Sequence, residues 1–368
     1  MIDIKDKSRC CGCEACLQRC PQACITMQED NRGFRYPVVD KDACIDCHLC
    51  EQVCPCLDEP EKKDTLACFS AIHPDEEIRY SSSSGGIFSL VAEWVISNGG
   101  VVFGARFNEK WEVVHDFTET IDGLAAFRGS KYVQSVIGKT FILAEDFLKQ
   151  GRQVLFTGTP CQIAGLKLFL HKDYPNLIAV EVACHGVPSP GVWRNYLHGQ
   201  QHVTEVNFRD KSTGWRNYSV LIGKKRKHHD DDDFMISFLA DHTIRESCFA
   251  CPSKQGKSGA DIMLADLWGA RKLSSLKDDN RGTSAILVFS SRGLSLLQQC
   301  GIELTDVDVN AVVKYNPSIR DCAHRPNDYD EFWKKYDKAP NWTLKRYGSL
   351  SFSMILLRFK RMIRRVIK

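Results

Sequence analysis

The sequence predicts two units of different fold class: a small α+β module over residues 1–57 and a larger α/β domain over residues 68–335. Three observations support this division. Cysteines are concentrated at the N-terminal end, where one spacing pattern occurs twice. The polar stretch 58–67 has the composition of a linker. Beyond it, apolar strand-like runs alternate with helical patterns, which is typical of an α/β domain.

Composition and charge narrow the function classes. A chain of 368 residues with a formal net charge of only +3, and with basic residues spread along its body, predicts no nucleic-acid surface. Met1–Asp6 contains no apolar run, so we expect no secretion signal and a cytoplasmic location. Eighteen cysteines in a reducing compartment indicate metal ligands or redox groups rather than disulfides.

The N-terminal module contains the pattern C-x-x-C-x-x-C-x-x-x-C-P twice. The two copies are formed by Cys10, Cys13, Cys16 and Cys20, and by Cys44, Cys47, Cys50 and Cys54. This spacing is typical of bacterial two-cluster ferredoxins, in which three evenly spaced thiolates hold one 4Fe-4S cluster and the fourth reaches the other cluster. We therefore predict crossed ligation, with Cys54 completing the first set and Cys20 the second. A zinc site is the disfavoured alternative, because zinc needs only four ligands and no trailing C-P.

Three other cysteines of this module, Cys11, Cys24 and Cys56, fall outside the pattern. We interpret them as small buried thiols. So small a module can fold because the clusters serve as its core, which couples metal loading to stability.

The first part of the α/β domain contains a predicted β-α-β unit. Residues 153–161 read as a strand, a turn with Gly158 and a helix start, and a second strand over residues 178–182 ends at Cys184. Parallel strands place Cys161 and Cys184 at the same edge of one sheet, where open α/β sheets bind ligands. The helix N-terminus favours the thiolate form of Cys161.

A C-x-x-C pair, Cys248 and Cys251, follows later in the chain. Together with Cys161 and Cys184 it makes four possible thiolate ligands. The spacing alone leaves two readings open: a third metal site, or two core cysteines beside a zinc-binding or free C-x-x-C.

Six sequence blocks in this domain resemble the beta subunit family of coenzyme F-420 hydrogenases and dehydrogenases, which also includes reductases of chlorophyll precursors. The blocks are Ser84–Gly86, Gly129–Tyr132, Gly158–Cys161, Cys184–Gly186, Cys248–Cys251 and Asp261–Gly269. The resemblance spans roughly residues 68–300, and other members carry a fused two-cluster ferredoxin unit at the N-terminus. It implies an FAD and a third 4Fe-4S cluster held by Cys161, Cys184, Cys248 and Cys251.

Two glycine-containing segments are candidates for contacts with the flavin. A diphosphate needs close backbone amides with a hydroxyl or cation nearby, and the candidate residues are Ser84, Gly85, Gly86, Gly129, Ser130, Lys131, Tyr132, Gly158 and Thr159. The alternative interpretation of each segment is a turn or a helix cap. His185 is the candidate proton donor, because its ordinary pKa lies near neutrality, with a structural histidine as the alternative. Asp261 and Asp266 either orient a cofactor or cap a turn.

The predicted function is an iron-sulfur flavoprotein oxidoreductase that takes electrons from ferredoxin or another low-potential donor. Clusters carry single electrons, whereas reduction of a small organic substrate takes a hydride equivalent, which a flavin assembles. Two alternatives stay open: hydride exchange with free deazaflavin, and a non-catalytic electron-transfer subunit of a larger complex.

Two charged segments complete the analysis. The run 224–233, rich in Lys, His and Asp, predicts a solvated loop rather than a metal site. Residues 345–368 carry eight basic and no acidic residues, which leaves the rest of the chain at −5, and their apolar residues fall on one helical face. This pattern predicts either an amphipathic helix at an anionic membrane surface, and so a peripheral position at its inner face, or a helix packed on the domain.

Overall fold

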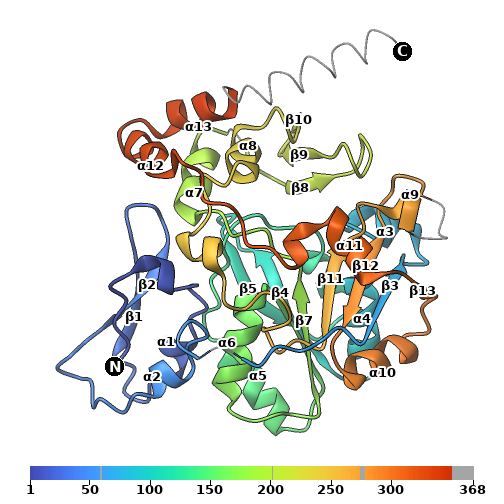
Figure 1. Ribbon diagram of the computed structural model, residues 1–368, viewed down its shortest axis with the longest axis horizontal. Coiled ribbons are helices and arrows are strands. Elements are labelled where there is room, and N and C mark those ends of the chain that lie inside the picture. Colours follow the sequence, from blue (N-terminus) through green and yellow to red (C-terminus); the bar gives the residue numbers. More distant parts are fainter. Residues whose placement is uncertain (59, 201, 274–277, 350–368) are drawn as a thin grey trace.

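The computed structural model describes residues 1–58, 60–200, 202–273 and 278–349 (Figure 1). In the view of Figure 1 the N-terminal module lies at the left, a large sheet fills the centre and right, and a smaller unit of helices and three strands lies above. Within the described ranges, no helix is long and apolar enough to cross a membrane.

The N-terminal module is built on one antiparallel hairpin, β1 (Ile25–Glu29) with β2 (Arg35–Val39). Each cysteine run contains a short helix that begins one residue before its third cysteine: α1 (Ala15–Arg19) includes Cys16, and α2 (Leu49–Gln52) includes Cys50. A 3-10 turn, η1 (Lys7–Arg9), precedes the first run.

The residues before the two helices show that the repeat is structural as well as sequential. Glu14 and His48 occupy the same motif position, and both adopt the left-handed backbone conformation, with φ of 60° and 59°. The chain therefore wraps each cysteine run with the same local geometry.

The α/β domain contains a mixed eight-stranded sheet. In spatial order its strands are β13 (Thr305–Asp306), β3 (Ala67–Ala71), β12 (Ser284–Val288), β11 (Ile262–Asp266), β7 (Leu177–Val182), β6 (Val154–Gly158), β4 (Val101–Phe107) and β5 (Val113–Thr118). The four central strands, β11, β7, β6 and β4, are parallel, and the flanking pairings are antiparallel. Strands β6 and β12 are buried along their whole length, which explains their continuous apolar sequence.

Helices cover both faces of the sheet, which gives three layers. α4 (Ile87–Ser97) and α10 (Ser291–Gln299) pack on one face through Val91, Val95 and Leu296. α5 (Thr140–Lys149) and α6 (Pro160–Leu170) pack on the other. The core on the α5 and α6 side continues into the N-terminal module, so the two units share one apolar interior.

A second, smaller sheet has the order β10-β9-β8 and is covered by helices that are rich in aromatic residues. Its parts are β8 (Val206–Asp210), β9 (Ser219–Ile222), β10 (Lys225–His228), α7 (Pro190–His198), α8 (Asp233–Leu239), α12 (Tyr329–Lys338) and α13 (Pro340–Ser349). The shorter remaining helices are α3 (Glu76–Ser81), η2 (Asp122–Phe127), η3 (Glu246–Ala250), α9 (Ala270–Leu273), α11 (Val309–Tyr315) and η4 (Pro317–Ile319).

The sequence predictions meet this fold with one correction. The predicted β-α-β unit is confirmed, since β6 leads into α6 and then into β7, parallel to β6. The predicted loop over residues 224–233 is wrong for its first half: Lys225–His228 forms β10, antiparallel to β9. A two-residue turn with Gly223 at φ +55° closes this hairpin, so an exposed basic run becomes an edge strand. Of the predicted C-terminal helix, 345–349 belong to α13, and 350–368 lie outside the described residues.

Candidate metal centres and cofactor site

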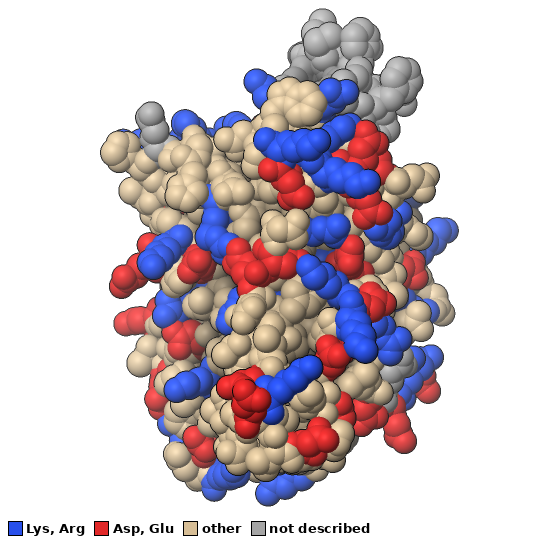
Figure 2. Space-filling view, turned by 90° about the vertical axis from the view of Figure 1, so that its left-hand side faces the viewer, with Lys and Arg blue, Asp and Glu red and all other residues tan. Residues whose placement is uncertain are grey.

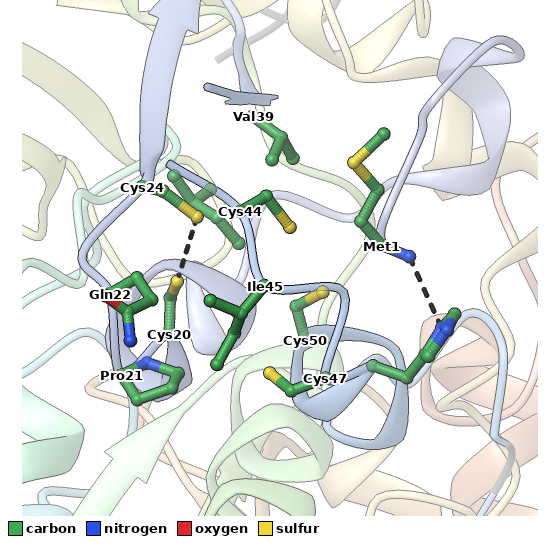
Figure 3. Close-up of a pocket in the computed structure, with 12 residues that line it drawn as sticks. Met1, Cys20, Pro21, Gln22, Cys24, Val39, Cys44, Ile45, Cys47 and Cys50 are labelled. Carbon is green, nitrogen blue, oxygen red and sulfur yellow. Dashed lines mark hydrogen bonds between the residues drawn. The ribbon is translucent and has the colours of Figure 1, made fainter. Parts of the chain in front are cut away.

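The cysteines of the N-terminal module line two pockets with crossed membership. The outer pocket is lined by Cys20, Cys44, Cys47 and Cys50 (Figure 3). The inner pocket is lined by Cys10, Cys13, Cys16 and Cys54. Each pocket thus takes three cysteines from one sequence run and the fourth from the other, which is the arrangement expected from the motif.

The outer pocket lies near the molecular surface. Cys47 is exposed, whereas Cys50 is buried at the base of α2. Backbone amides already point at two of its sulfurs: Ile2 N donates to Cys50 Sγ at 3.3 Å, and Asp46 N to Cys44 Sγ at 3.4 Å. Such bonds stabilise ligated thiolates. Cys24 also lines the pocket, with its sulfur 3.4 Å from that of Cys20 (Figure 3).

The inner pocket is buried, and all four of its cysteines are 7–8% exposed. Burial raises the pKa of Cys10 and that of Cys16, because a thiolate without a cation is poorly solvated there. One buried cation, the guanidinium of Arg245, lies against it, with Nη2 3.5 Å from Cys10 Sγ and Nε 2.7 Å from the Cys10 carbonyl. The ligands of this pocket therefore need metal charge to ionise.

A third cysteine group forms at the edge of the large sheet. Cys161 lies in the first turn of α6, directly after β6, and Cys184 follows the neighbouring strand β7. Cys248 and Cys251 lie in and just after η3. Arg245 N donates to Val187 O, and this contact holds η3 against the segment that follows Cys184. The structure thus brings all four cysteines together.

The four thiols of this group influence one another's ionisation. Burial raises the pKa of Cys184 to about 12, and it raises those of Cys248 and Cys251 as well, with the neighbouring cysteines adding to the effect. The pKa of Cys161 is lowered, first by the neighbouring Cys11 thiol and also by a hydrogen bond with the Thr159 hydroxyl. Cys161 is therefore the most readily ionised member, and the cause is these neighbours rather than the helix start on which the prediction rested.

The spacing of the sulfurs argues against a single metal ion in any of the three cysteine groups. Among the described residues, no three cysteine sulfurs lie within 4.8 Å of one another. Zinc–sulfur bonds of about 2.3 Å in a tetrahedron need sulfurs about 3.8 Å apart. The wider, all-thiolate donor sets fit a cubane iron-sulfur group, whose corners spread the ligands.

Cys11 joins the inner pocket to the third cysteine group. It lines the inner pocket, and the neighbouring thiols of Cys13, Cys161 and Cys56 raise the pKa of Cys11 well above its ordinary value. Cys56 in turn has Cys11 and Cys54 as thiol neighbours, which lower its pKa. Both extra cysteines are buried, as predicted, but sequence reasoning missed their position, because it depends on how the module docks on α6.

The two predicted flavin segments lie side by side. Ser130 N and Ser130 Oγ bond Ser83 Oγ at 2.6 and 2.8 Å, which joins the Gly129–Tyr132 segment to the Ser84–Gly86 loop. Gly86 starts α4 at φ +89°, and no side chain caps this helix start. Gly129 faces open space, whereas Gly85 is required by packing, since a Cβ there would lie 2.6 Å from Ala71 O.

Other predicted flavin residues already have protein partners. Lys131 Nζ donates to the carbonyls of Ala126 and Arg128, and burial lowers its pKa to about 7. Thr159 N donates to Gln162 Oε1 at the start of α6, and Gly158 ends β6 beside it. Tyr132 accepts a hydrogen bond from Arg209 Nη1 at 3.1 Å.

Arg209 and Lys211 were missed by sequence reasoning. Arg209 is 4% exposed, pairs with Asp266 at 3.1 Å and lies over the rings of Tyr218 and Trp268, while its Nε has no partner among the described residues. Lys211 Nζ donates to the carbonyls of Arg79, Ser84 and Arg281, which uses all three of its protons, and burial lowers its pKa to about 7. The R-D-K sequence at the end of β8 was the available signal. The buried Arg209 guanidinium beside the Ser84 loop, with Nε unpartnered among the described residues, fits the chemistry of a bound diphosphate.

His185 forms a pair with an aspartate. Its Nε2 lies 2.5 Å from Asp241 Oδ1, and its side chain is 36% exposed. Asp241 holds a left-handed backbone conformation at φ +64°, which costs free energy in a non-glycine residue. Asp261 has a structural position instead, because its carboxylate accepts hydrogen bonds from Ala179 N and Ser290 Oγ.

Comparisons with known proteins agree with this architecture. Residues 151–310 match the family model for the C terminus of the coenzyme F420 hydrogenase/dehydrogenase beta subunit, and residues 9–57 match a 4Fe-4S dicluster domain. A chain of the xenon-derivatised F420-reducing NiFe hydrogenase complex from Methanosarcina barkeri has a similar fold, with a TM-score of 0.51 and 16% identity over 71% of this chain and 91% of that chain. At that identity the likeness concerns the fold alone. Curated proteins gave no significant match.

Proposed function

Because residues 151–310 carry the C-terminal domain of the coenzyme F420 hydrogenase/dehydrogenase beta subunit family behind a 4Fe-4S dicluster domain, we propose that the chain is an iron-sulfur flavoprotein oxidoreductase. It takes electrons from a low-potential donor such as ferredoxin, through three 4Fe-4S clusters, to FAD, for reduction of a small organic substrate. The proposed ligands are the four cysteines of the outer pocket, of the inner pocket and of the third cysteine group.

The bridge formed by Cys11 is the observation that carries this proposal. The Cys11 thiol lines the inner pocket, and its neighbours Cys13 of that pocket and Cys161 of the third group both raise its pKa. Cys13 also packs directly on α6, the helix that carries Cys161, because a Cβ at Gly165 would lie 2.9 Å from the Cys13 sulfur. When bound, iron-sulfur clusters exchange single electrons and a flavin exchanges one or two. The residues of this junction therefore support a connected path rather than two independent metal sites.

The exposure of the two pockets supports an inward direction. Cys47 of the outer pocket is exposed, and Ile45 beside it is 61% exposed, so a donor protein can approach there. Figure 2 views the side that carries the N-terminal module, where acidic and basic side chains are interspersed. The buried inner pocket follows, with the Arg245 cation against Cys10. A cation there stabilises added negative charge and makes electron transfer toward the interior favourable.

The start of α4 is the proposed anion-binding site for the diphosphate of FAD. The uncapped start of α4 presents backbone amides after Gly86, and Ser84, Ser130, Arg209 and Lys211 surround that start. Hydroxyls and a buried guanidinium at a helix N-terminus match a diphosphate in charge and geometry. Most of the predicted flavin residues belong to this proposed anion-binding site.

His185 is proposed as the proton donor to the reduced substrate. It immediately follows the third-group ligand Cys184, and Asp241 fixes one ring nitrogen, so the ring is held in one orientation. The backbone cost at Asp241 is consistent with a positioning role for that carboxylate. Deazaflavin is a candidate for the organic acceptor, because the matched family is named for that coenzyme.

The basic tail supplies a second, independent part of the proposal. We propose that residues 345–368 attach the chain to an anionic membrane surface, because eight basic residues occur there without an acidic one. Each basic residue near an anionic leaflet contributes roughly 1 kcal/mol, screened by salt. A helix packed on the domain would gain little from this charge.

Rapid mixing of reduced ferredoxin with the anaerobic full chain, reconstituted with iron, sulfide and FAD, tests the relay. We expect the visible absorbance of the flavin to bleach without a further protein. Cys54→Ser should slow the bleaching, whereas Cys300→Ser, which changes a cysteine at the end of α10 outside all three groups, should not. If the flavin binds but is never reduced by ferredoxin, the chain is an electron-transfer subunit that needs a partner enzyme.

A further inference from the structure

Three side chains at the end of β10 converge outside every cysteine group. One ring nitrogen each from His228 and His229 and one carboxylate oxygen from Asp230 lie within 4.8 Å of one another. Their side chains are only 15%, 12% and 12% exposed. The sequence predicted a solvated loop here, but the β9–β10 hairpin turns these residues inward, toward the ring of Tyr218.

The orientation of His229 is fixed by its surroundings. Its Nδ1 lies 2.9 Å from the Tyr218 carbonyl, and because a carbonyl only accepts, that nitrogen is the donor. The ring also stacks on Tyr218, with centroids 4.2 Å apart. In the neutral ring the lone pair is therefore on Nε2, which faces Asp230 Oδ1 at 3.1 Å. Two acceptors at this distance repel unless a cation lies between them or a proton occupies Nε2.

The same contact pattern is typical of metal-binding histidines. A ligating histidine almost always donates its other ring N–H to a carbonyl or carboxylate, which fixes the tautomer and raises the basicity of the ligating nitrogen. His228 contributes a second imidazole, whose ring lies 4.3 Å from that of His229. Its Nδ1 lies 3.9 Å from Asp230 Oδ2 and accepts a hydrogen bond from Asp230 N at 3.3 Å, so a metal ion bound at this nitrogen replaces that hydrogen bond. Two imidazoles and one carboxylate form a donor set suited to zinc, with water completing a tetrahedron.

We propose that His228, His229 and Asp230 form a binding site for a divalent metal ion of the zinc class, separate from the iron-sulfur groups. The site lies at the turn between β10 and α8, where Asp232 caps α8 and bonds the Tyr196 hydroxyl. A bound ion ties the hairpin to α8. The loop after α8 carries Asp241, the partner of His185, so the ion also limits motion of that pair.

Zinc K-edge X-ray absorption on the anaerobic, iron-sulfur-loaded full chain tests the site. After addition of Zn²⁺ and removal of the excess over a competing chelator, we expect one zinc per chain, with nitrogen and oxygen neighbours at about 2.0–2.1 Å. A first shell of sulfur at about 2.3 Å, or no retained zinc, would overturn the proposal. A first shell of sulfur means that zinc binds to cysteines. Absence of retained zinc means that a protonated His229 forms an ion pair with Asp230.

Matched variants assign the metal to these side chains. His229→Gln and Asp230→Asn should weaken zinc binding by about 100-fold or more, since loss of even an outer partner of a metal ligand costs 10–100-fold. His198→Gln, at the exposed end of α7, should bind zinc as the unchanged chain does. Equal zinc affinity of Asp230→Asn and the unchanged chain, with equal iron content, refutes the site. If a variant fails to fold, the absorption shell of the unchanged chain still decides.

Discussion

Replacement of Arg245 by Met should lower the reduction potential of the cluster proposed for the inner pocket and leave that of the outer pocket unchanged. The guanidinium is fully buried and bonds Cys10 Sγ at 3.5 Å, the carbonyls of Cys10 and Arg35, and Gln134 Oε1. It also stacks on Tyr36, 4.1 Å from the ring centroid. Removal of this cation leaves any added electron without its nearest positive charge.

The size of the effect follows from these distances. A unit charge at 3.5 Å gains about 5 kcal/mol at an effective dielectric constant of about 20. An added electron is shared over the whole cluster, so we take roughly a third of this, about 1.5 kcal/mol. Since about 1.4 kcal/mol corresponds to about 59 mV for one electron, the potential should fall by about 60 mV.

The assay is a redox titration of the anaerobic full chain, followed by electron paramagnetic resonance, with the outer cluster as an internal reference. Arg19→Gln, which removes a cation at the end of α1 that lies over Phe169, is the matched control. An upward shift, an equal shift of both clusters, or no shift in folded Arg245→Met would refute the reasoning. Loss of the buried cation also costs about 3–5 kcal/mol of stability. If Arg245→Met does not fold, Arg245→Lys is tested in its place. Because Arg245→Lys keeps the positive charge, the reduction potential should shift by less than half of the value expected for Arg245→Met.

Four further outcomes are expected. Fully loaded protein should contain about 12 irons, and Cys161→Ser or Cys251→Ser should lower the count to about 8 with both N-terminal clusters retained; iron analysis of about 8 in the unchanged chain would remove the third cluster. A form lacking residues 1–57 should still bind FAD but accept electrons from ferredoxin much more slowly, and equal reduction rates of the two forms would contradict the relay order. Asp241→Asn should reduce turnover and change its pH profile while FAD and iron contents stay constant, whereas an unchanged profile would leave His185 with a structural role. In co-sedimentation with anionic liposomes at low salt, the full chain should bind and a form ending at Tyr347 should not, and high salt should release the full chain; equal sedimentation would favour a packed helix.

Local pattern was sufficient for the cysteine motifs and for the β-α-β unit. The spacing of the motif cysteines predicts which of them share a pocket, because a short loop around a metal group is governed by neighbours in sequence. The parallel pairing of β6 and β7 follows in the same way from two apolar runs joined by a capped helix, and it brings Cys161 and Cys184 to one edge.

Tertiary docking explains what the sequence did not reveal. Cys11 lies next to Cys161 only because the N-terminal module packs on α6, and Arg245 reaches Cys10 from a segment 235 positions away. Arg209 becomes an anion-site candidate only when the second sheet folds over the Ser84 loop. In the run 224–233 the charges suggested a loop. A strand forms instead, because the turn at Gly223 brings the run beside β9, and the backbones of β9 and β10 pair.

Glu14 and His48, the left-handed residues at matching positions of the two cysteine runs, have different surroundings. Glu14 is 3% exposed, and its carboxylate bonds Arg35 and the amide of Gly138 in the α/β domain. His48, at the matching position, has a side chain that is 55% exposed and forms polar contacts with the N-terminal amine, Asp46 and Glu51. The backbone shape is the same in both halves, whereas one half has a buried anchor to the α/β domain and the other half faces solvent. Substitutions at Glu14 should therefore disturb the docking of the module, and substitutions at His48 should be tolerated better.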